Sequence, residues 1–546
     1  MIILHPRIHT LSKDLMRPEN PWGTVEALQI LDGRVVRAGA RAEVLRHRAA
    51  GEPVEAIDGA CVLPGLIDTH AHLTGLSMRP GALDLPDDLP PLQWAEAVAA
   101  AAAGLSPGVW ITGRAWNQAV WRDEDCQGLR RSPEGFPAHD LLSAAAPDNP
   151  VVLHRTDQHA AWVNAAALRA AGVHRHLPDP EGGLIVRDPA GEPLGVLVDE
   201  AVGLVARALP PLDAAQRRAL LAEKGRLFLS RGVTTVHCAL IKPEDLDHYA
   251  HVLTGDERLG LRVRGMVYDE PAALEAWARQ NKPWRDEGGW WSVETLKAFA
   301  DGALGSRGAW FFDPYEGATA CGLSVATPPE IEALGRAALA GGWQLATHAI
   351  GDRAITETID AYARAGWTAD LSDRLRWRVE HVQHPRLDAL DKMAALGLFA
   401  AMQPIHATRD MRFVAALLGH QRASLSYPWR AVADRGIPTG FGSDYPIETL
   451  DPFAGLHAAL TRQDEAGRPD GGWFPEHRLG RLEAMLAYTR GGAGLMGRDR
   501  DDLGHLGPEA HADLIALDVD PSQDAPEALL RVHVQRVWTA GQELAL

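Results

Sequence analysis

The sequence predicts an α/β protein built on a (β/α)8 TIM-like barrel, with a small β-sandwich-like domain formed from both termini. Three observations lead to this prediction. Between residues 62 and 442, short apolar segments alternate with helical stretches, which is typical of parallel strands joined by helices. Extended segments interrupted by Asp-Gly turns occur near the start of the chain, and similar segments occur near its end. Metal-binding residue types follow several of the barrel segments.

Eight barrel strands are expected, each a short apolar run. They are residues 62–70, 234–238, 261–267, 295–299, 344–348, 376–381, 399–403 and 438–442. One helix between them is well marked. Pro329 and Glu330 open it, its apolar positions repeat every 3.6 residues, and Gly341-Gly342 ends it. Eight parallel strands with helices between them close naturally into a barrel.

The remaining segments suggest how the domains are divided. Strand-like patterns occur at residues 25–31, 33–38, 54–57, 512–517 and 531–539. We therefore expect residues 1–61 and 500–546 to form one composite β domain and residues 62–499 to form the barrel. The first two barrel strands are separated by far more residues than a simple crossover needs. Residues 75–220, approximately, are therefore expected to be an insertion that overhangs the active site.

Charge and cysteine content argue against several classes of protein. The formal net charge of −18 is opposite to what a nucleic-acid-binding protein needs. The four cysteines (Cys61, Cys126, Cys238 and Cys321) show no CxxC spacing, so we expect no thiolate zinc site and a cytoplasmic location. Neither a signal peptide nor an apolar run of 18 residues is visible, so no membrane association is expected.

Candidate metal ligands stand at the end of the first barrel strand, in LPGLIDTHAHL. His70 and His72 are two residues apart, so in an extended strand both imidazoles point to the same face and could share one metal. An isolated HxH pair is weak evidence, because a chain with 23 histidines can contain one by chance. The pair gains weight only if other strands end in the same way.

Other strands do end in this way. His348 ends the fifth strand, His381 ends the sixth with His384 three residues further on, and Asp444 follows the eighth. Active sites of such barrels lie at the carboxyl ends of the strands. Each histidine could instead be a hydrogen-bonded core residue, but that explanation would have to hold four times at the same end of the barrel. The pattern therefore favours a metal centre.

Lys297, on the fourth strand, is the remaining candidate ligand. The chain contains only six lysines against 48 arginines, and a lysine on a buried strand is costly unless it is paired or neutralised. Reaction with carbon dioxide would give an anionic carbamate that could bridge two metals. The alternative is an ion pair with Asp301, Asp444 or Glu380. We favour the carbamate.

The motifs together resemble the amidohydrolase superfamily, specifically its YtcJ-like branch (amidohydrolase family 3), which includes the N-substituted formamide deformylases. The matching stretches are VLPGLIDTHAHL at 62–73, LKAFADGALGSRGAWFFDPY at 296–315, ATHAIGDRAI at 346–355, RVEHVQHP at 378–385, AAMQPIHAT at 400–408, GFGSDYPIE at 440–448 and GPEAHADLIALDVDP at 507–521. They occur in the expected order and cover nearly the whole chain. The set is specific for the superfamily and much less specific for the substrate.

The resemblance implies a ligand set for one or two divalent metal ions. His70, His72 and Asp444 would bind one metal, His348 and His381 the other, and a carbamylated Lys297 would bridge them. Zinc is the expected metal for ligands of this type, although iron, manganese or nickel could also bind. The expected reaction is hydrolysis of a non-peptide C–N bond in an amide or formamide by a metal-activated hydroxide. Asp444 is expected to transfer the proton from water to the departing amine.

Substrate contacts and partners are predicted less sharply. Five residues fall in the insertion or near the expected mouth of the barrel: Trp116, His159, Arg307, Gln403 and His406. Trp116 could equally be a packing residue, and Arg307 could pair with an acidic loop residue. A small-molecule substrate is the expected partner, and a homodimer is the expected assembly.

Two alternatives stay open at this point. The first is a deaminase of a heterocyclic substrate on the same barrel, although His348 is not followed by a glutamate three residues later. The second is a non-catalytic regulatory protein on this fold, although none of the expected ligands is missing.

Overall fold

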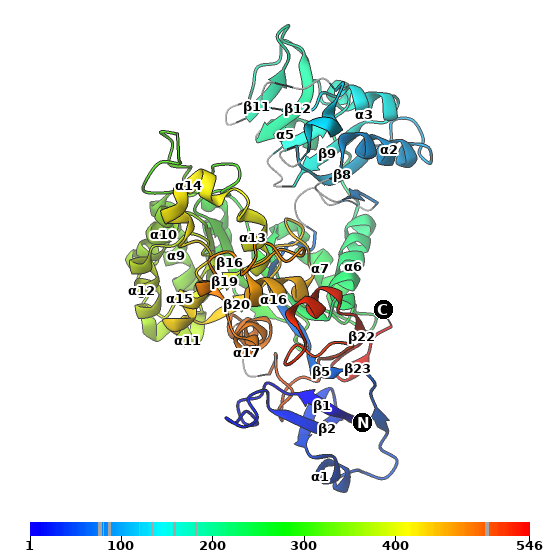
Figure 1. Cartoon of the computed structure of the whole chain (residues 1–546), viewed down its shortest axis with the longest axis vertical. Coiled ribbons are helices and arrows are strands. Elements are labelled where there is room, and N and C mark those ends of the chain that lie inside the picture. The colour runs from blue at the N-terminus through cyan, green and yellow to red at the C-terminus, as the bar shows by residue number, and fades with distance from the viewer. Residues whose placement is uncertain are drawn as a thin grey trace. The chain divides into compact units, whose positions relative to one another are not determined.

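A computed structural model describes the chain from residue 1 to residue 545. It leaves out residues 75–78, 80, 86–88, 119–120, 130–131, 133–134, 157–159, 181–182, 200 and 497–501. The chain falls into two compact units, one of residues 1–73 with 221–546 and the other of residues 74–220 (Figure 1). Each unit is described below by itself.

The first unit contains a parallel sheet of eight strands, as the sequence predicts. In spatial order these strands are β6 (Leu66–Ala71), β13 (Val233–Ile241), β14 (Arg262–Val267), β16 (Trp291–Phe299), β17 (Gln344–Ala349), β18 (Arg378–His381), β19 (Phe399–Met402) and β20 (Thr439–Phe441). A short strand β15 (Trp284–Arg285) pairs antiparallel with β16. Each predicted barrel strand overlaps one of these eight, so the predicted barrel is confirmed.

The ends of the sheet meet where the predicted metal ligands lie. The backbone N–H of Asp444 donates to the carbonyl of His70 at 2.7 Å, and that of His72 donates to the carbonyl of Tyr445 at 2.7 Å. The buried carboxylate of Asp68 accepts hydrogen bonds from the backbone N–H and hydroxyl of Ser443. These contacts join β6 to the segment after β20 and close the barrel at its carboxyl end.

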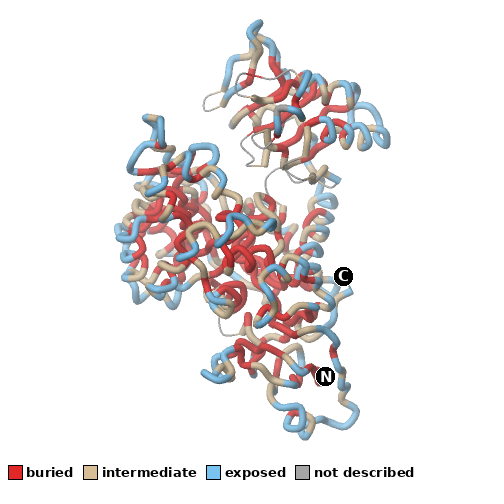
Figure 2. The backbone as a smooth tube through the Cα atoms, viewed as in Figure 1, coloured by how far each residue is buried: buried red, intermediate tan, exposed pale blue. Residues whose placement is uncertain are grey.

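Helices surround the barrel strands in the first unit, and Figure 2 shows buried residues gathered in its interior. The helices of this unit are α1 (Arg41–Arg46), α6 (Ala214–Ser230), α7 (Leu246–Leu253), α8 (Pro271–Gln280), α9 (Pro328–Gly341), α10 (Asp352–Ala365), α11 (Ser372–Leu375), α12 (Leu387–Ala395), α13 (Pro404–Asp410), α14 (Val414–Ala423), α15 (Trp429–Asp434), α16 (Pro452–Thr461), α17 (Arg481–Leu486) and α18 (Gly492–Gly494). Helix α1 packs on the terminal strands, and α6 begins in the other unit. No helix in the described part of the chain has both the length and the apolar character needed to cross a membrane.

Helix α9 has the predicted start and end. Thr327 and Glu330 form a capping box at its N-terminus, and Gly342 follows it with a φ of 78°. A capping box satisfies free backbone N–H groups, and a glycine readily adopts a positive φ at the helix end.

Both termini contribute to one further sheet. Its order is β23 (Gln542–Glu543), β22 (Val534–Thr539), β21 (Leu514–Leu517), β5 (Cys61–Pro64), β1 (Ile2–His9), β2 (Thr24–Leu31) and β3 (Arg34–Gly39), with β4 (Val54–Ala56) beside β1. Strand β1 is not among the predicted strands, because Pro6 interrupts its apolar run and proline weakens a strand pattern.

The single strand predicted at residues 62–70 is wrong in one respect: it is two strands in two different sheets. β5 pairs with β21 in the terminal sheet, whereas β6 pairs with β13 in the barrel. Gly65 lies between them, and a Cβ atom there would be 2.1 Å from Oγ1 of Thr234. Only a glycine can therefore occupy this crossing without displacing Thr234.

The second unit has a sheet of its own, which the sequence analysis did not predict. The order is β11 (Gly183–Arg187), β12 (Pro193–Asp199), β10 (Ala160–Val163), β9 (Val151–Arg155), β8 (Ile111–Trp116) and β7 (Leu83–Asp84). Helices α2 (Pro91–Ala102), α3 (Asp140–Ala145), α4 (Ala165–Ala170) and α5 (Val202–Ala206) accompany it. The buried indoles of Trp94, Trp116 and Trp162 belong to its core, so the insertion packs as an independent body.

Candidate metal centre

The structure brings the predicted metal ligands of the barrel together in its interior. His70 is on β6 and His72 directly follows it, His348 is on β17, His381 ends β18, and Asp444 follows β20. All five side chains are buried.

Distances between these side chains are those of one small cluster. One ligand atom each from His70, His381 and Asp444 lies within 4.8 Å of the other two. Nε2 of His72 is 3.0 Å from Oδ1 of Asp444. The ring centroids of His348 and His381 are 4.5 Å apart, so His348 adjoins the same cluster. Side chains from four strand ends therefore face a common space.

Three histidines of this cluster, His70, His348 and His381, are neutral at pH 7. Burial, with Lys297 nearby, lowers the pKa of His70 to about 4 and that of His348 to about 3. Burial and the neighbouring His348 hold the pKa of His381 well below its usual range. A neutral imidazole keeps one nitrogen lone pair, which is the form that binds a metal.

Hydrogen bonds orient three of the rings. Oxygen atoms accept the Nδ1–H of three of the rings: a carboxylate oxygen of Glu380 at 2.5 Å from His70, the amide oxygen of Gln403 at 2.8 Å from His381, and the carbonyl of Ala239 at 3.3 Å from His72. When Nδ1 carries the proton, Nε2 is left with the lone pair. For His70, Nε2 is therefore the nitrogen left to bind a divalent metal.

Asp444 lies between two of the histidines. Its Oδ1 is 3.0 Å from Nε2 of His72 and its Oδ2 is 3.2 Å from Nε2 of His406. Burial opposes its ionisation, but His70, His406 and His72 together hold its pKa well below the usual range. Its φ is 58°, a left-handed conformation that is uncommon for non-glycine residues. Asp444 is therefore an anion held where a metal or a proton can reach it.

Lys297 is completely buried on β16, and its Nζ has no hydrogen-bond partner among the described residues. Burial lowers its pKa to about 8. The three acids considered as its partners are occupied elsewhere. Asp301 accepts from backbone N–H groups of the loop after β17, Glu380 contacts Arg378 and His70, and Asp444 contacts His72 and His406. The structure therefore shows none of the proposed ion pairs.

Two carboxylates that support the cluster appear in the sequence analysis only as candidate partners of Lys297. Glu380 contacts His70, and Asp301 lies with Oδ1 3.5 Å from Nε2 of His348. A third buried carboxylate, Asp68, which accepts from the backbone N–H of His70, is not predicted at all. In the sequence, each stands within four residues of a predicted ligand, and that proximity is the available signal.

The predicted substrate contacts lie in different places. Gln403 and His406 border the cluster through His381 and Asp444. Arg307 is exposed in the loop after β16, with its guanidinium 5.8 Å from the ring of Tyr315. Trp116 is buried in the core of the insertion, where its indole N–H donates to the carbonyl of Leu153. His159 lies outside the described residues.

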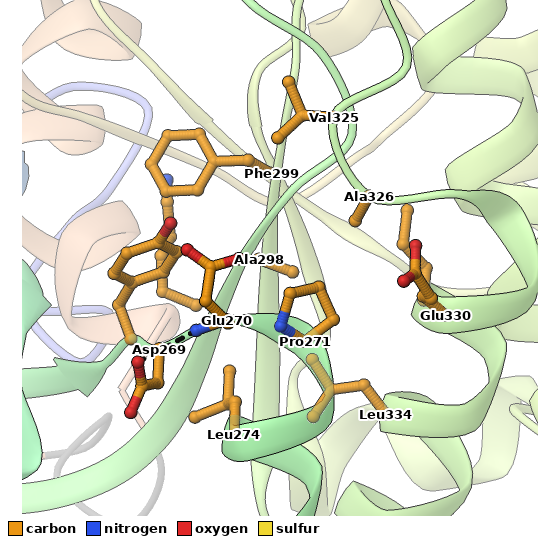
Figure 3. Close-up of a pocket in the computed structure, with 13 residues that line it drawn as sticks. Asp269, Glu270, Pro271, Leu274, Ala298, Phe299, Val325, Ala326, Glu330 and Leu334 are labelled. Carbon is orange, nitrogen blue, oxygen red and sulfur yellow. Dashed lines mark hydrogen bonds between the residues drawn. The ribbon is translucent and has the colours of Figure 1, made fainter. Parts of the chain in front are cut away.

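A separate cavity of about 50 Å³ lies beside this cluster, at the carboxyl ends of β14 and β16. Figure 3 shows apolar side chains of Phe299, Pro271 and Leu334 around it, together with the carboxylates of Glu270 and Glu330. Lys297 is the one predicted metal ligand among its lining residues. The cavity therefore neighbours the metal centre and does not contain it.

Comparison with known proteins agrees with this geometry. Residues 54–545 match the model of the amidohydrolase family. The chain belongs to the amidohydrolase family. This amidohydrolase is 30% identical to YtcJ of Bacillus subtilis (strain 168), named as an amidohydrolase, over 95% of both chains. It is 27% identical to the N-substituted formamide deformylase of Arthrobacter pascens, over 94% of both chains.

A solved structure extends the comparison. The chain resembles an uncharacterized metal-dependent hydrolase from Pyrococcus furiosus, with a TM-score of 0.74 and 25% identity over 96% of this chain and 99% of the other. Family membership and this likeness support a metal-dependent hydrolase. The buried neutral histidines and the ionised Asp444 described above are suitable ligands for a divalent metal.

Proposed function

We propose that this amidohydrolase cleaves a non-peptide C–N bond of the amide or formamide type in a small molecule. The observation that carries the proposal is the convergence of His70, His72, His348, His381 and Asp444 on one buried space. Similarity to a formamide deformylase over nearly the whole chain supports the bond type.

The proposed ligand set follows the strands. His70, His72 and Asp444 would hold one divalent metal, and His348 and His381 would hold a second. Zinc suits neutral imidazole and carboxylate ligands. When bound, such a metal lowers the pKa of water and polarises the substrate carbonyl.

Lys297 would bridge the two metals as a carbamate. Its amine is buried, has no hydrogen-bond partner within the described part of the chain, and has a pKa of about 8, so an appreciable fraction is the neutral nucleophile. Attack of the Nζ lone pair on the carbon of carbon dioxide forms the N–C bond, and one amine proton leaves to solvent. The product is an anion, which removes the cost of a buried, unpaired cation.

Asp444 would move the proton. Its carboxylate is ionised and lies between His72 and His406, so it can accept a proton from the attacking water and pass it to the departing amine nitrogen. His406 would hold the substrate oxygen as a protonated imidazole. Burial lowers the pKa of His406, but the neighbouring Asp444 outweighs burial and raises that pKa to about 9. Gln403 keeps His381 in place.

The test combines metal analysis with a substrate panel. The purified protein is loaded with zinc, its metal content is measured, and release of formate, free amine or ammonia is followed with N-substituted formamides, simple amides and amino-heterocycles. We expect bound zinc and amine release from the first two classes, and loss of about 100-fold to 10,000-fold in kcat for Asp444→Asn. Ammonia release from the heterocycles alone would make the protein a deaminase. Bound zinc without any turnover would indicate a binding protein.

A further inference from the structure

The ring of the predicted ligand His70 is hydrogen-bonded to the buried carboxylate of Glu380, on the side that faces away from Asp444. Oε2 of Glu380 lies 2.5 Å from Nδ1 of His70. On the other side of the ring, Nε2 lies 3.5 Å from Oδ1 of Asp444. The ring is therefore held between one carboxylate that orients it and another that belongs to the predicted metal centre.

The hydrogen bond to Glu380 determines the position of the ring proton. An ionised carboxylate has acceptors only, so the contact requires Nδ1 of His70 to carry the hydrogen. A neutral imidazole, the form that binds a metal, carries a single N–H. Nε2 must then hold its lone pair toward Asp444.

Arg378 keeps Glu380 in the form that this arrangement needs. Nε of Arg378 donates to Oε1 of Glu380 at 2.6 Å, and both side chains are buried. Arg378 is itself fixed, because its terminal nitrogens donate to the carbonyl of Leu495 and to Sδ of Met266.

The backbone explains how Glu380 and its neighbour His381 both serve the site. Successive residues of a strand point to opposite faces. His381 has a φ of 75°, which interrupts that alternation at the end of β18. As a result Glu380 contacts His70 while His381 joins the metal cluster.

We infer that Glu380, held by Arg378, is the positioning residue that fixes His70 with Nε2 free for the metal. The inference rests on the proposed function only in taking His70 as a ligand. Carboxylates behind metal-binding histidines orient the ring and raise its basicity, and their loss typically weakens metal binding by about 10-fold to 100-fold.

The experiment compares full-length Glu380→Gln with the wild type, using zinc alone as the probe. Zinc affinity is measured by competition with a chelator, and the tautomer of His70 in the metal-free protein is read from its ring ¹⁵N chemical shifts. We expect zinc affinity to fall by about 10-fold to 100-fold and the share of the Nδ1–H tautomer to decrease.

A matched control separates this role from general loss of a buried ion pair. Asp513 and Arg262 form such a pair at 2.7 Å, with both side chains buried and neither belonging to the metal cluster. Asp513→Asn should lower stability and leave zinc affinity and the His70 tautomer unchanged. If Glu380→Gln fails to fold, Arg378→Met with Glu380→Leu removes both charges together and leaves none unpaired. This double variant should still lose zinc affinity.

The measurement is made on Glu380→Gln, or on the double variant if Glu380→Gln does not fold. The inference would be overturned if that protein had the zinc affinity of the wild type or the His70 tautomer of the wild type. If wild-type protein bound no zinc, the proposed function would fail instead. The two failures are therefore distinguishable without measuring turnover.

Discussion

At the scale of single residues, this amidohydrolase keeps charged and polar groups in a place where proteins normally keep apolar ones. Arg378, Glu380 and Lys297 are buried inside the barrel, alongside the histidine cluster. Burying a charge is costly unless a partner or a hydrogen bond compensates it. Arg378 and Glu380 compensate each other at 2.6 Å, whereas Lys297 has no hydrogen-bond partner within the described residues. Lys297 therefore gives the most direct test at this scale.

Lys297→Met should separate stability from metal binding. Burial shifts the pKa of Lys297 from 10.5 to about 8, so the folded protein below pH 8 carries the cost of a buried cation. That cost disappears as pH rises from 8 to 10.5, because the folded chain loses its proton first. At pH 7, methionine should raise the free energy of unfolding of the metal-free protein by up to about 3 kcal/mol.

The same variant should hold fewer zinc ions per chain than the wild type, because the proposed bridging carbamate is gone. Urea unfolding and metal analysis measure the two effects. Exposed Lys282, changed to methionine, is the control and should alter neither. A Lys297→Met protein that binds as much zinc as the wild type would argue against the bridge.

The sequence predicts the cluster at this scale but not its supporting residues. Histidines at strand ends are visible because the carboxyl ends of parallel strands meet at one place. The supporting role of Glu380 is not predicted, because regular alternation along a strand would direct its side chain away from the face occupied by His381. The positive φ of His381 that brings both to the interior is a tertiary feature with no local sequence signal.

At the scale of elements, Gly442 allows the first and last barrel strands to approach each other closely. A Cβ atom at Gly442 would lie 2.6 Å from Oδ1 of Asp68 and 2.6 Å from the backbone nitrogen of His70. No side chain fits there unless β6 and the segment after β20 separate. The barrel is therefore closed tightly beside the predicted metal ligands.

Gly442→Ala should destabilise the protein and weaken zinc binding together. Overpacking a rigid contact typically costs about 1–3 kcal/mol. Separation of the strands would also displace His70 from Asp444. Gly494→Ala is a matched control, because a Cβ atom there meets nothing within 4 Å. Thermal unfolding and chelator competition on both variants would check the prediction, and normal zinc affinity in Gly442→Ala would contradict it.

Helix α9 offers a second test at this scale. Oγ1 of Thr327 and Oε2 of Glu330 are hydrogen-bonded in its capping box. Thr327→Ala should lower the free energy of unfolding by about 1 kcal/mol, the usual effect of losing an N-cap. Thr327→Ser keeps the hydroxyl and should recover most of that loss in urea unfolding.

The elements also show which strands a sequence can reveal. The eight barrel strands and α9 are predicted because each has a clear apolar period or strong boundary residues. The division between β5 and β6 is not predicted, because residues 61–71 resemble one continuous strand. The change of sheet depends on a contact between Gly65 and Thr234, which only the fold creates. Pairing of strands from opposite ends of the chain depends in the same way on contacts that only the fold creates.

At the scale of the whole molecule, the insertion is a compact unit with its own sheet and core. Its length is predictable from the gap between the first two barrel strands, but its internal sheet is not. The strands β8 to β12 are short and are separated by segments rich in glycine and proline, which obscures their pattern. An independent core nevertheless predicts a stability that can be altered without touching the barrel.

His154 gives the insertion a sensitivity to acid. It is buried on β9, and burial lowers its pKa to about 4. In the unfolded chain its pKa would be close to 6.5. As pH falls from 6.5 towards 4, the unfolded chain takes up a proton that the folded insertion does not, so stability decreases. From pH 7.5 to 5.0 the loss due to His154 should be about 2 kcal/mol.

His154→Leu in the full-length chain should remove this part of the pH dependence, because leucine does not ionise. Unfolding in urea, followed by tryptophan fluorescence at pH 7.5 and 5.0, gives the difference for wild type and variant. Other buried histidines, such as His348, contribute equally to both proteins, so the comparison isolates His154. Exposed His174 in the same unit, changed to leucine, should leave the wild-type dependence intact. If His154→Leu loses as much stability in acid as the wild type, burial of this imidazole does not govern the acid response of the insertion.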